Sequence, residues 1–178
     1  QRYRESLDLL ERAIPHKGLS QNLLFNLTHA SQGVRSWAKV TLYGQAFMHR
    51  EKGGKDAVEV SRMVDAAFAE LAKNGKVPVT YRFDVKPDAI DVLVNGVPVA
   101  NAPVNEVRLL PGRYVISASR DHFAPWSETL EVAEGSGPQT VVRALDPIIY
   151  EGKVKITTDP AEGVLVYMDE QLIGTTPI

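Results

Sequence analysis

The chain has 178 residues, of which 44% are hydrophobic and 24% charged, a balance typical of a folded globular protein. Because 20 Lys and Arg stand against 22 Asp and Glu, the chain lacks the basic excess with which nucleic-acid-binding proteins meet phosphates. Cysteine is absent, which excludes disulfides, thiolate metal sites and cysteine nucleophiles.

Residues 1–75 have the periodicity of helices. Apolar residues recur at spacings of three and four, as on the buried face of a helix. The pattern predicts helices at residues 1–14, 20–31, 36–50 and 56–73. Pro15 to Gly18 predicts a break after the first of them, and Ser36 is a candidate N-cap of the third. Gln1 already stands inside a helical pattern, so we expect that the chain has been trimmed at this end.

After Pro78 the period changes to two, as in half-buried β-strands. Val79, Tyr81, Phe83 and Val85 alternate with polar residues, and Asn95-Gly96 suits the tight turn of a hairpin. The pattern predicts strands at residues 79–86, 92–94, 97–99, 106–110, 114–119, 127–132 and 140–145, with a boundary at 146–147 and a new β pattern from 153. Short strands at this spacing indicate a small sandwich.

The helical part contains an internal repeat. Tyr3 and Trp37 are 34 residues apart, and apolar positions after Tyr3 fall on apolar or small positions after Trp37. The segment from Leu24 to Ala30, followed by Trp37, resembles the first helix and the turn of a tetratricopeptide repeat, whose period is about 34 residues. The match has departures, because Val40 and Gly44 replace the residues usually found inside the helix pair and Thr28 stands where Gly or Ala is usual.

The β part also repeats, at an offset of 74 residues. Residues 92–104 align without gaps to residues 166–178. The second copy has a strand at 154–158, a turn around Pro160, a second strand, and the sequence Gly-Thr-Thr-Pro at 174–177. In this it resembles the PEGA domain. The first copy is more diverged, with Asn95-Gly96 at the hairpin and Pro111-Gly112 before a later strand.

These resemblances imply an α+β multidomain chain. Residues 1–75 would form tetratricopeptide-like helical hairpins with an incomplete first repeat. Residues 77–147 would form a first small all-β, sandwich-like PEGA domain, and residues 152–178 the truncated start of a second. Because the first copy continues about 40 residues beyond the equivalent of the last residue, we expect further chain, or another chain, to complete the second domain.

Catalytic and cofactor motifs are not recognisable in the sequence. The four histidines lack metal-ligand spacing, and Gly53-Gly54-Lys55 lacks the further glycine and the Ser or Thr of a phosphate loop. Gly135-Ser136-Gly137 lacks the spacing of a nucleophile elbow. Most carboxylates fall at strand ends and turns, where they serve local hydrogen bonds. We therefore expect no enzyme activity, no cofactor and no metal site.

The helical repeat resemblance implies a concave groove that takes a protein partner. The residues it places along the groove or at its rim are Asn22, Asn26, His29, Ala30, Arg35 and Lys39. In the β region, Trp126 is the one aromatic residue singled out as a surface contact, although packing on the sheet is the more ordinary role for it.

The leading functional hypothesis is a non-catalytic, protein-binding scaffold of the bacterial cell envelope or periplasm. It would form part of a larger envelope, secretion or motility assembly, with β-domains as spacers or cell-wall contacts and any membrane anchor outside these residues. Two alternatives stay open. One is a peptidoglycan- or carbohydrate-binding module, and the other is an accessory arm of a larger enzyme or sensor.

Overall fold

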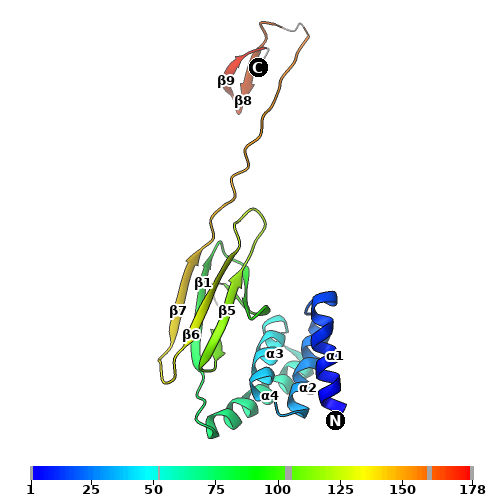
Figure 1. Ribbon diagram of the computed structural model, residues 1–178. Coiled ribbons are helices and arrows are strands. Elements are labelled where there is room, and N and C mark those ends of the chain that lie inside the picture. Colours follow the sequence, from blue (N-terminus) through cyan, green and yellow to red (C-terminus); the bar gives the residue numbers. More distant parts are fainter. Residues whose placement is uncertain (1, 52, 103–105, 160–161, 177–178) are drawn as a thin grey trace. The chain divides into compact units, whose positions relative to one another are not determined.

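The chain folds into two compact units, residues 1–147 and 148–178, in a computed structural model (Figure 1). The structure describes all residues except 1, 52, 103–105, 160–161 and 177–178, and omits the side chains of 16 and 17. The helices and the first β region, assigned above to separate domains, belong to the same compact unit. The expectation of a mixed α+β chain is confirmed, because helices and β-sheets are both present.

Four helices form the N-terminal part of the first unit: α1 (Arg2–Lys17), α2 (Gln21–Gly33), α3 (Trp37–Arg50) and α4 (Gly54–Lys73). Each packs against the next along the chain, and α2 also touches α4. Their buried faces follow the helical period, with Leu24, Leu27 and Phe47 almost wholly inaccessible. Gly44 on α3 allows the close approach of α4, since a Cβ there would lie 2.3 Å from Cγ2 of Val64.

Helix α1 differs from the sequence prediction, which ended it at Ile14. It runs to Lys17 with Pro15 inside it. Proline removes a single backbone hydrogen bond so close to the end of the helix, and the last turn is closed by the Gly18 N–H, which donates to the Ile14 carbonyl at 2.9 Å. Gly18, at φ +66°, then turns the chain away.

The helix N-termini differ in their caps. Ser20 caps α2, because its Oγ accepts a hydrogen bond from the Leu23 N–H at 3.2 Å. Ser36 stands at the predicted N-cap position of α3, but its hydroxyl makes no capping hydrogen bond.

Seven strands complete the first unit: β1 (Val79–Lys86), β2 (Ile90–Val94), β3 (Val97–Ala102), β4 (Glu106–Leu109), β5 (Gly112–Ala118), β6 (Trp126–Val132) and β7 (Gln139–Ala144). They form two sheets, with strand orders β4-β1-β7 and β3-β2-β5-β6. All neighbouring strands are antiparallel except β1 and β7, which are parallel.

The two sheets share one hydrophobic core with the helices. Phe83 and Val85 of β1 are fully buried, as are Val92 and Val94 of β2 and Ile116 of β5. Alternate residues of β1 are more exposed, as the period of two predicts. On the helical side, α3 lies against β3, so the first hairpin is covered by a helix as well as by strands.

The second unit contains one described hairpin, formed by β8 (Leu165–Met168) and β9 (Gln171–Thr175). The prediction of a strand at residues 154–158 is wrong, since these residues form no strand. The segment matches β1 in the repeat, and β1 is flanked by β4 and β7. In the described part of the second unit no strand flanks residues 154–158, so alternation alone does not make them a strand. Pro160 and Pro177 lie outside the described residues.

Candidate functional site

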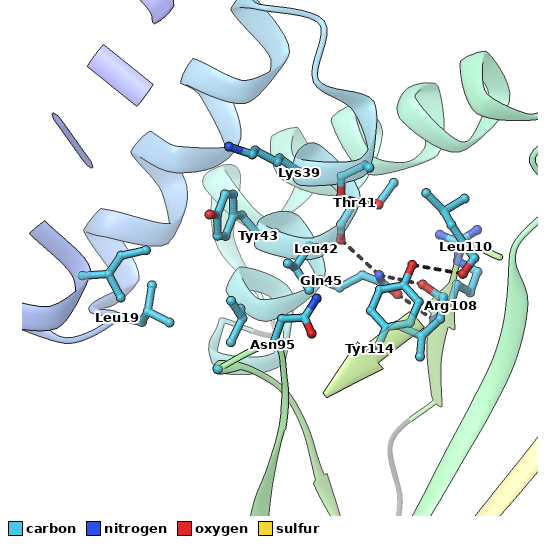
Figure 2. A pocket seen from close by; sticks show the side chains of 15 residues that line it. Leu19, Lys39, Thr41, Leu42, Tyr43, Gln45, Asn95, Arg108, Leu110 and Tyr114 are labelled. Carbon is cyan, nitrogen blue, oxygen red and sulfur yellow. Dashed lines mark hydrogen bonds between the residues drawn. The ribbon is translucent and has the colours of Figure 1, made fainter. Parts of the chain in front are cut away.

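A cavity of about 440 Å³ lies where α3 meets the strands of the first unit (Figure 2). Its apolar wall comes from both layers, and includes Ile14, Leu19, Leu42, Val97, Leu109 and Leu110. Polar side chains stand around this wall, namely Lys39, Tyr43, Gln45, Asn95, Arg108 and Tyr114. A mainly apolar hollow with a few placed polar groups is the usual form of a binding pocket.

Gln45 joins the helical layer to the edge strand β4 beside this cavity. Its Oε1 accepts the backbone N–H of Arg108 at 2.8 Å, and its Nε2 donates to the Arg108 carbonyl at 3.0 Å (Figure 2). The amide side chain thereby satisfies both backbone groups of a residue at the open edge of the sheet. Arg108 is held on the other side as well, since its guanidinium contacts Asp65 at 3.0 Å and lies 4.1 Å from the centre of the Phe68 ring.

A second polar group connects α3 to α1. The Glu11 carboxylate accepts hydrogen bonds from the Tyr43 hydroxyl at 2.8 Å and from Lys39 Nζ at 2.8 Å. Burial, and then the neighbouring Glu11 carboxylate, raise the pKa of Tyr43 far above its ordinary value. Because Glu11 already takes the charge of Lys39, the cavity is suited to an apolar group more than to a bare anion.

On the strand side of the cavity, the polar side chains are also held by hydrogen bonds. The Tyr114 hydroxyl donates to the Leu110 carbonyl at 3.0 Å, and burial raises the pKa of Tyr114. Asn95, at the tip of the first hairpin, accepts the backbone N–H of Val115 through its Oδ1 at 2.8 Å. The polar rim is therefore built from side chains held by their own hydrogen bonds.

A second hollow, of about 390 Å³, lies between α1 and α2. It is lined by Tyr3, Ser6, Leu9, Leu10, Asn26, His29 and Ala30. Leu9 is 65% exposed and Tyr3 59% exposed, so two large apolar side chains face solvent at this surface. Exposed apolar side chains that gather at a hollow with polar neighbours are a feature of protein-binding surfaces.

The residues predicted to line a partner groove fall in three places. Asn26, His29 and Ala30 share the hollow between α1 and α2, and Asn22 is exposed on α2, one turn before Asn26. Lys39 lines the other cavity, at the junction with the strands. Arg35 is exposed in the turn between α2 and α3, at φ +56°.

His29 is the most constrained of these side chains. Its ring lies 4.4 Å from that of Phe25. Its Nε2 approaches the Glu59 carboxylate at 3.4 Å, without the geometry of a hydrogen bond. The ring therefore joins α2 to α4 on one side and faces the hollow on the other.

Trp126 is half-buried at the start of β6 and packs against the core. The Arg143 guanidinium lies 5.6 Å from the centre of its ring and is also paired with Glu128 at 2.6 Å. Core contacts and a cation therefore both lie against the ring on which a sugar would stack.

No group of His, Asp and Glu side chains in the described residues has the arrangement of a metal site. Across the same residues, no helix combines the length and apolar character needed to cross a bilayer. A comparison with models of protein families finds no match, and none of the curated proteins matches the sequence.

Sequence reasoning missed three residues that shape these surfaces, Glu11, Tyr43 and Gln45. Glu11 and Tyr43 are 32 positions apart, and Gln45 and Arg108 are 63 apart. No local pattern marks such pairs. The only available signal was that a glutamine and a glutamate fall next to the apolar faces of their helices.

Proposed function

We propose that the chain is a non-catalytic, protein-binding scaffold of the bacterial cell envelope, and part of a larger envelope, secretion or motility assembly. The helices resemble tetratricopeptide repeats and the β regions resemble PEGA domains, and these resemblances supply the cellular setting. The observation that carries the binding role is the hollow between α1 and α2, where exposed Tyr3 and Leu9 lie beside Asn26 and His29.

The hollow offers a partner both apolar contact and directional hydrogen bonds. Burying the exposed part of a leucine side chain is worth about 1 kcal/mol or more at roughly 25 cal/mol per Å². The Asn26 amide has donors and an acceptor that fit an extended peptide backbone. A partner segment with an apolar anchor and a free stretch of backbone is the ligand that this surface suits.

The test is affinity capture of envelope proteins by the whole chain and by two variants. Leu9→Lys places a charge in the hollow, whereas Val58→Lys places the same charge on α4, where Val58 is 52% exposed. We expect one bound protein to be lost with Leu9→Lys and retained with Val58→Lys. Point variants are preferable to deletion of the helices, because the helices and the first β region share one core.

Two outcomes would contradict the proposal. One is the absence of any captured protein that distinguishes the two variants. The other is sedimentation of the chain with purified peptidoglycan, lost in Trp126→Ala, which would move the function to the β region and to the cell wall.

A further inference from the structure

The cavity between α3 and the strands plays no part in the function proposed above. Its lining comes from the end of α1 and the loop after it, from α3, from the tip of the β2–β3 hairpin, and from β4 and β5. All of these elements belong to the first unit. The shape of the cavity therefore depends on contacts within one compact unit.

The apolar wall of the cavity is part of the core of the first unit. Val97, Leu109 and Leu110 are 5%, 3% and 8% exposed, and all three belong to the main hydrophobic cluster. Leu42 of α3 packs against the same cluster from the helical side. A wall anchored in this way is formed before any ligand arrives, so binding an apolar group costs little reorganisation.

Gln45 has no donor left for a ligand. One Nε2 hydrogen of this side chain donates to the Thr41 carbonyl and the other to the Arg108 carbonyl, each at 3.0 Å. Its Oε1 accepts the Arg108 N–H at 2.8 Å. An amide group has only two donor hydrogens, and both are used within the protein.

The hydroxyl groups at the cavity are used in the same way. The single hydroxyl hydrogen of Tyr43 goes to Glu11, and that of Tyr114 goes to the Leu110 carbonyl. A phenol has one donor hydrogen, so neither tyrosine can donate to a ligand without giving up its present partner.

The charges at the cavity are compensated as well. The Glu11 carboxylate lies 2.6 Å from Lys39 Nζ, and the Asp65 carboxylate lies 3.0 Å from the Arg108 guanidinium. A charged ligand would lose its hydration here without gaining an unpaired counterion. The electrostatics therefore favour a neutral ligand.

Asn95, at the tip of the hairpin, supplies the donor that the other amide and the hydroxyls lack. Its Oδ1 and its backbone N–H are both bonded to Val115. Its Nδ2 donates to no group in the described residues. Figure 2 shows this nitrogen turned toward α3, across the cavity. The side chain is thus held by its oxygen and offers its nitrogen to a ligand.

We propose that the cavity binds a neutral, mainly apolar small molecule with one hydrogen-bond acceptor, such as a ketone or ester carbonyl. The apolar body lies on the wall formed by Val97, Leu109 and Leu110, and the carbonyl oxygen accepts a hydrogen bond from Asn95 Nδ2. At roughly 30 Å³ for each non-hydrogen atom, the volume of about 440 Å³ holds about 15 such atoms.

This site adds a small-molecule ligand to the protein partner proposed for the helices. It shares no lining residue with the hollow between α1 and α2. Either site can therefore fail without the other.

The probe is 4-phenyl-2-butanone, a neutral ketone, titrated into the isotope-labelled whole chain while amide NMR signals are followed. We expect saturable shifts at the backbone amides of Leu42, Val97 and Leu110 and at the side-chain amide of Asn95. Butylbenzene is the comparison ligand without an acceptor, and 4-phenylbutyrate is the comparison ligand with a negative charge. We expect butylbenzene to shift the same backbone amides and 4-phenylbutyrate to bind at least tenfold more weakly than the ketone.

Asn95→Asp tests the hydrogen bond to the ligand. The variant keeps an oxygen for the Val115 N–H and removes the donor, and aspartate tolerates this turn, since Asp169 has φ +48° at the corresponding position of the second hairpin. We expect the ketone to bind about fivefold to tenfold more weakly and butylbenzene to bind as before. Asn22→Asp, which adds the same charge on the exposed side of α2, should leave both affinities unchanged.

Ala38→Phe tests the apolar part of the site. Ala38 lines the cavity but is exposed on α3, so a phenyl ring there can fill the cavity without entering the core. We expect this variant to lose the ketone. Ala66→Phe places the same ring on the exposed side of α4 and should bind the ketone as the parent does.

Four results would overturn the proposal. They are the absence of saturable shifts at the cavity, equal ketone binding by the Ala38 and Ala66 variants, an equal effect of Asn95→Asp on the ketone and on butylbenzene, and binding of 4-phenylbutyrate as tight as that of the ketone.

Discussion

Replacing Gln45 by alanine tests how the helices are attached to the first β region. The variant leaves the N–H and the carbonyl of Arg108 without their side-chain partner at a part-buried position. An unpaired buried backbone group costs about 1 to 3 kcal/mol, and partial access of water favours the lower end. We therefore expect a loss of about 2 to 3 kcal/mol in the free energy of unfolding.

A glutamate at the same position separates the contributions of the two hydrogen bonds to this loss of stability. Gln45→Glu keeps an acceptor for the Arg108 N–H but removes the donor to the Arg108 carbonyl, so we expect about half of the effect of alanine. Gln139→Ala serves as the control, because Gln139 is exposed and its side chain donates to the carbonyl of Gly137, two residues away, at 3.3 Å. Its effect should stay within about 0.5 kcal/mol.

The assay is urea unfolding followed by far-ultraviolet circular dichroism and by tryptophan fluorescence. Trp37 lies in the helices and Trp126 in the sheets, and both pack against one core, so the two probes should report one transition whose midpoint Gln45→Ala lowers. The reasoning would be refuted if Gln45→Ala matched Gln139→Ala in stability.

Two further predictions concern the helical layer. Gly44→Ala should destabilise the chain by about 1 to 3 kcal/mol, because the added Cβ would meet Val64, whereas Gly53→Ala has open space and should be nearly neutral in thermal unfolding. Tyr43 has a pKa raised above its unfolded value of 10.0, so the stability that depends on its protonated form is complete below pH 10 and is lost above it. Above pH 10 the free energy of unfolding should fall more steeply with pH in the parent than in Tyr43→Phe, by up to about 1.4 kcal/mol per pH unit, and equal slopes would contradict the role of the buried hydroxyl.

Much of the fold could be predicted from the sequence because burial follows the period of each element. Leu24 and Leu27 mark the inner face of α2, and Phe83 and Val85 mark that of β1. The Asn95-Gly96 turn was recognisable because both residues adopt positive φ there. The repeat at an offset of 74 residues was also visible, and the structure extends it, because the register shift between Val92 and Leu93 recurs between Val166 and Tyr167.

The missed features depend on contacts between distant residues. Pro15 stays inside a helix because the last turn is completed by the hydrogen bond from the Gly18 N–H to the Ile14 carbonyl. The presence of a proline in the sequence does not reveal this hydrogen bond. Apolar and polar residues alternate over 154–158 as in a strand, but a strand also needs a neighbouring strand with which to form backbone hydrogen bonds. The repeat resemblance placed Lys39 at the rim of the groove that contains His29, whereas in the structure Lys39 lines a different cavity, where α3 packs against β3.

The parallel pairing of β1 with β7 has a consequence for how the first unit folds. Among the strands of the first unit β1 is synthesised first and β7 last, so one side of β1 has no partner until synthesis has almost reached residue 144. Closing such a distant pair late costs loop entropy and slows folding. We expect the helices to form within the dead time of a stopped-flow experiment and the two sheets to close in a slower phase. During that interval the open side of β1 is the part of the chain most exposed to aggregation and to binding by chaperones.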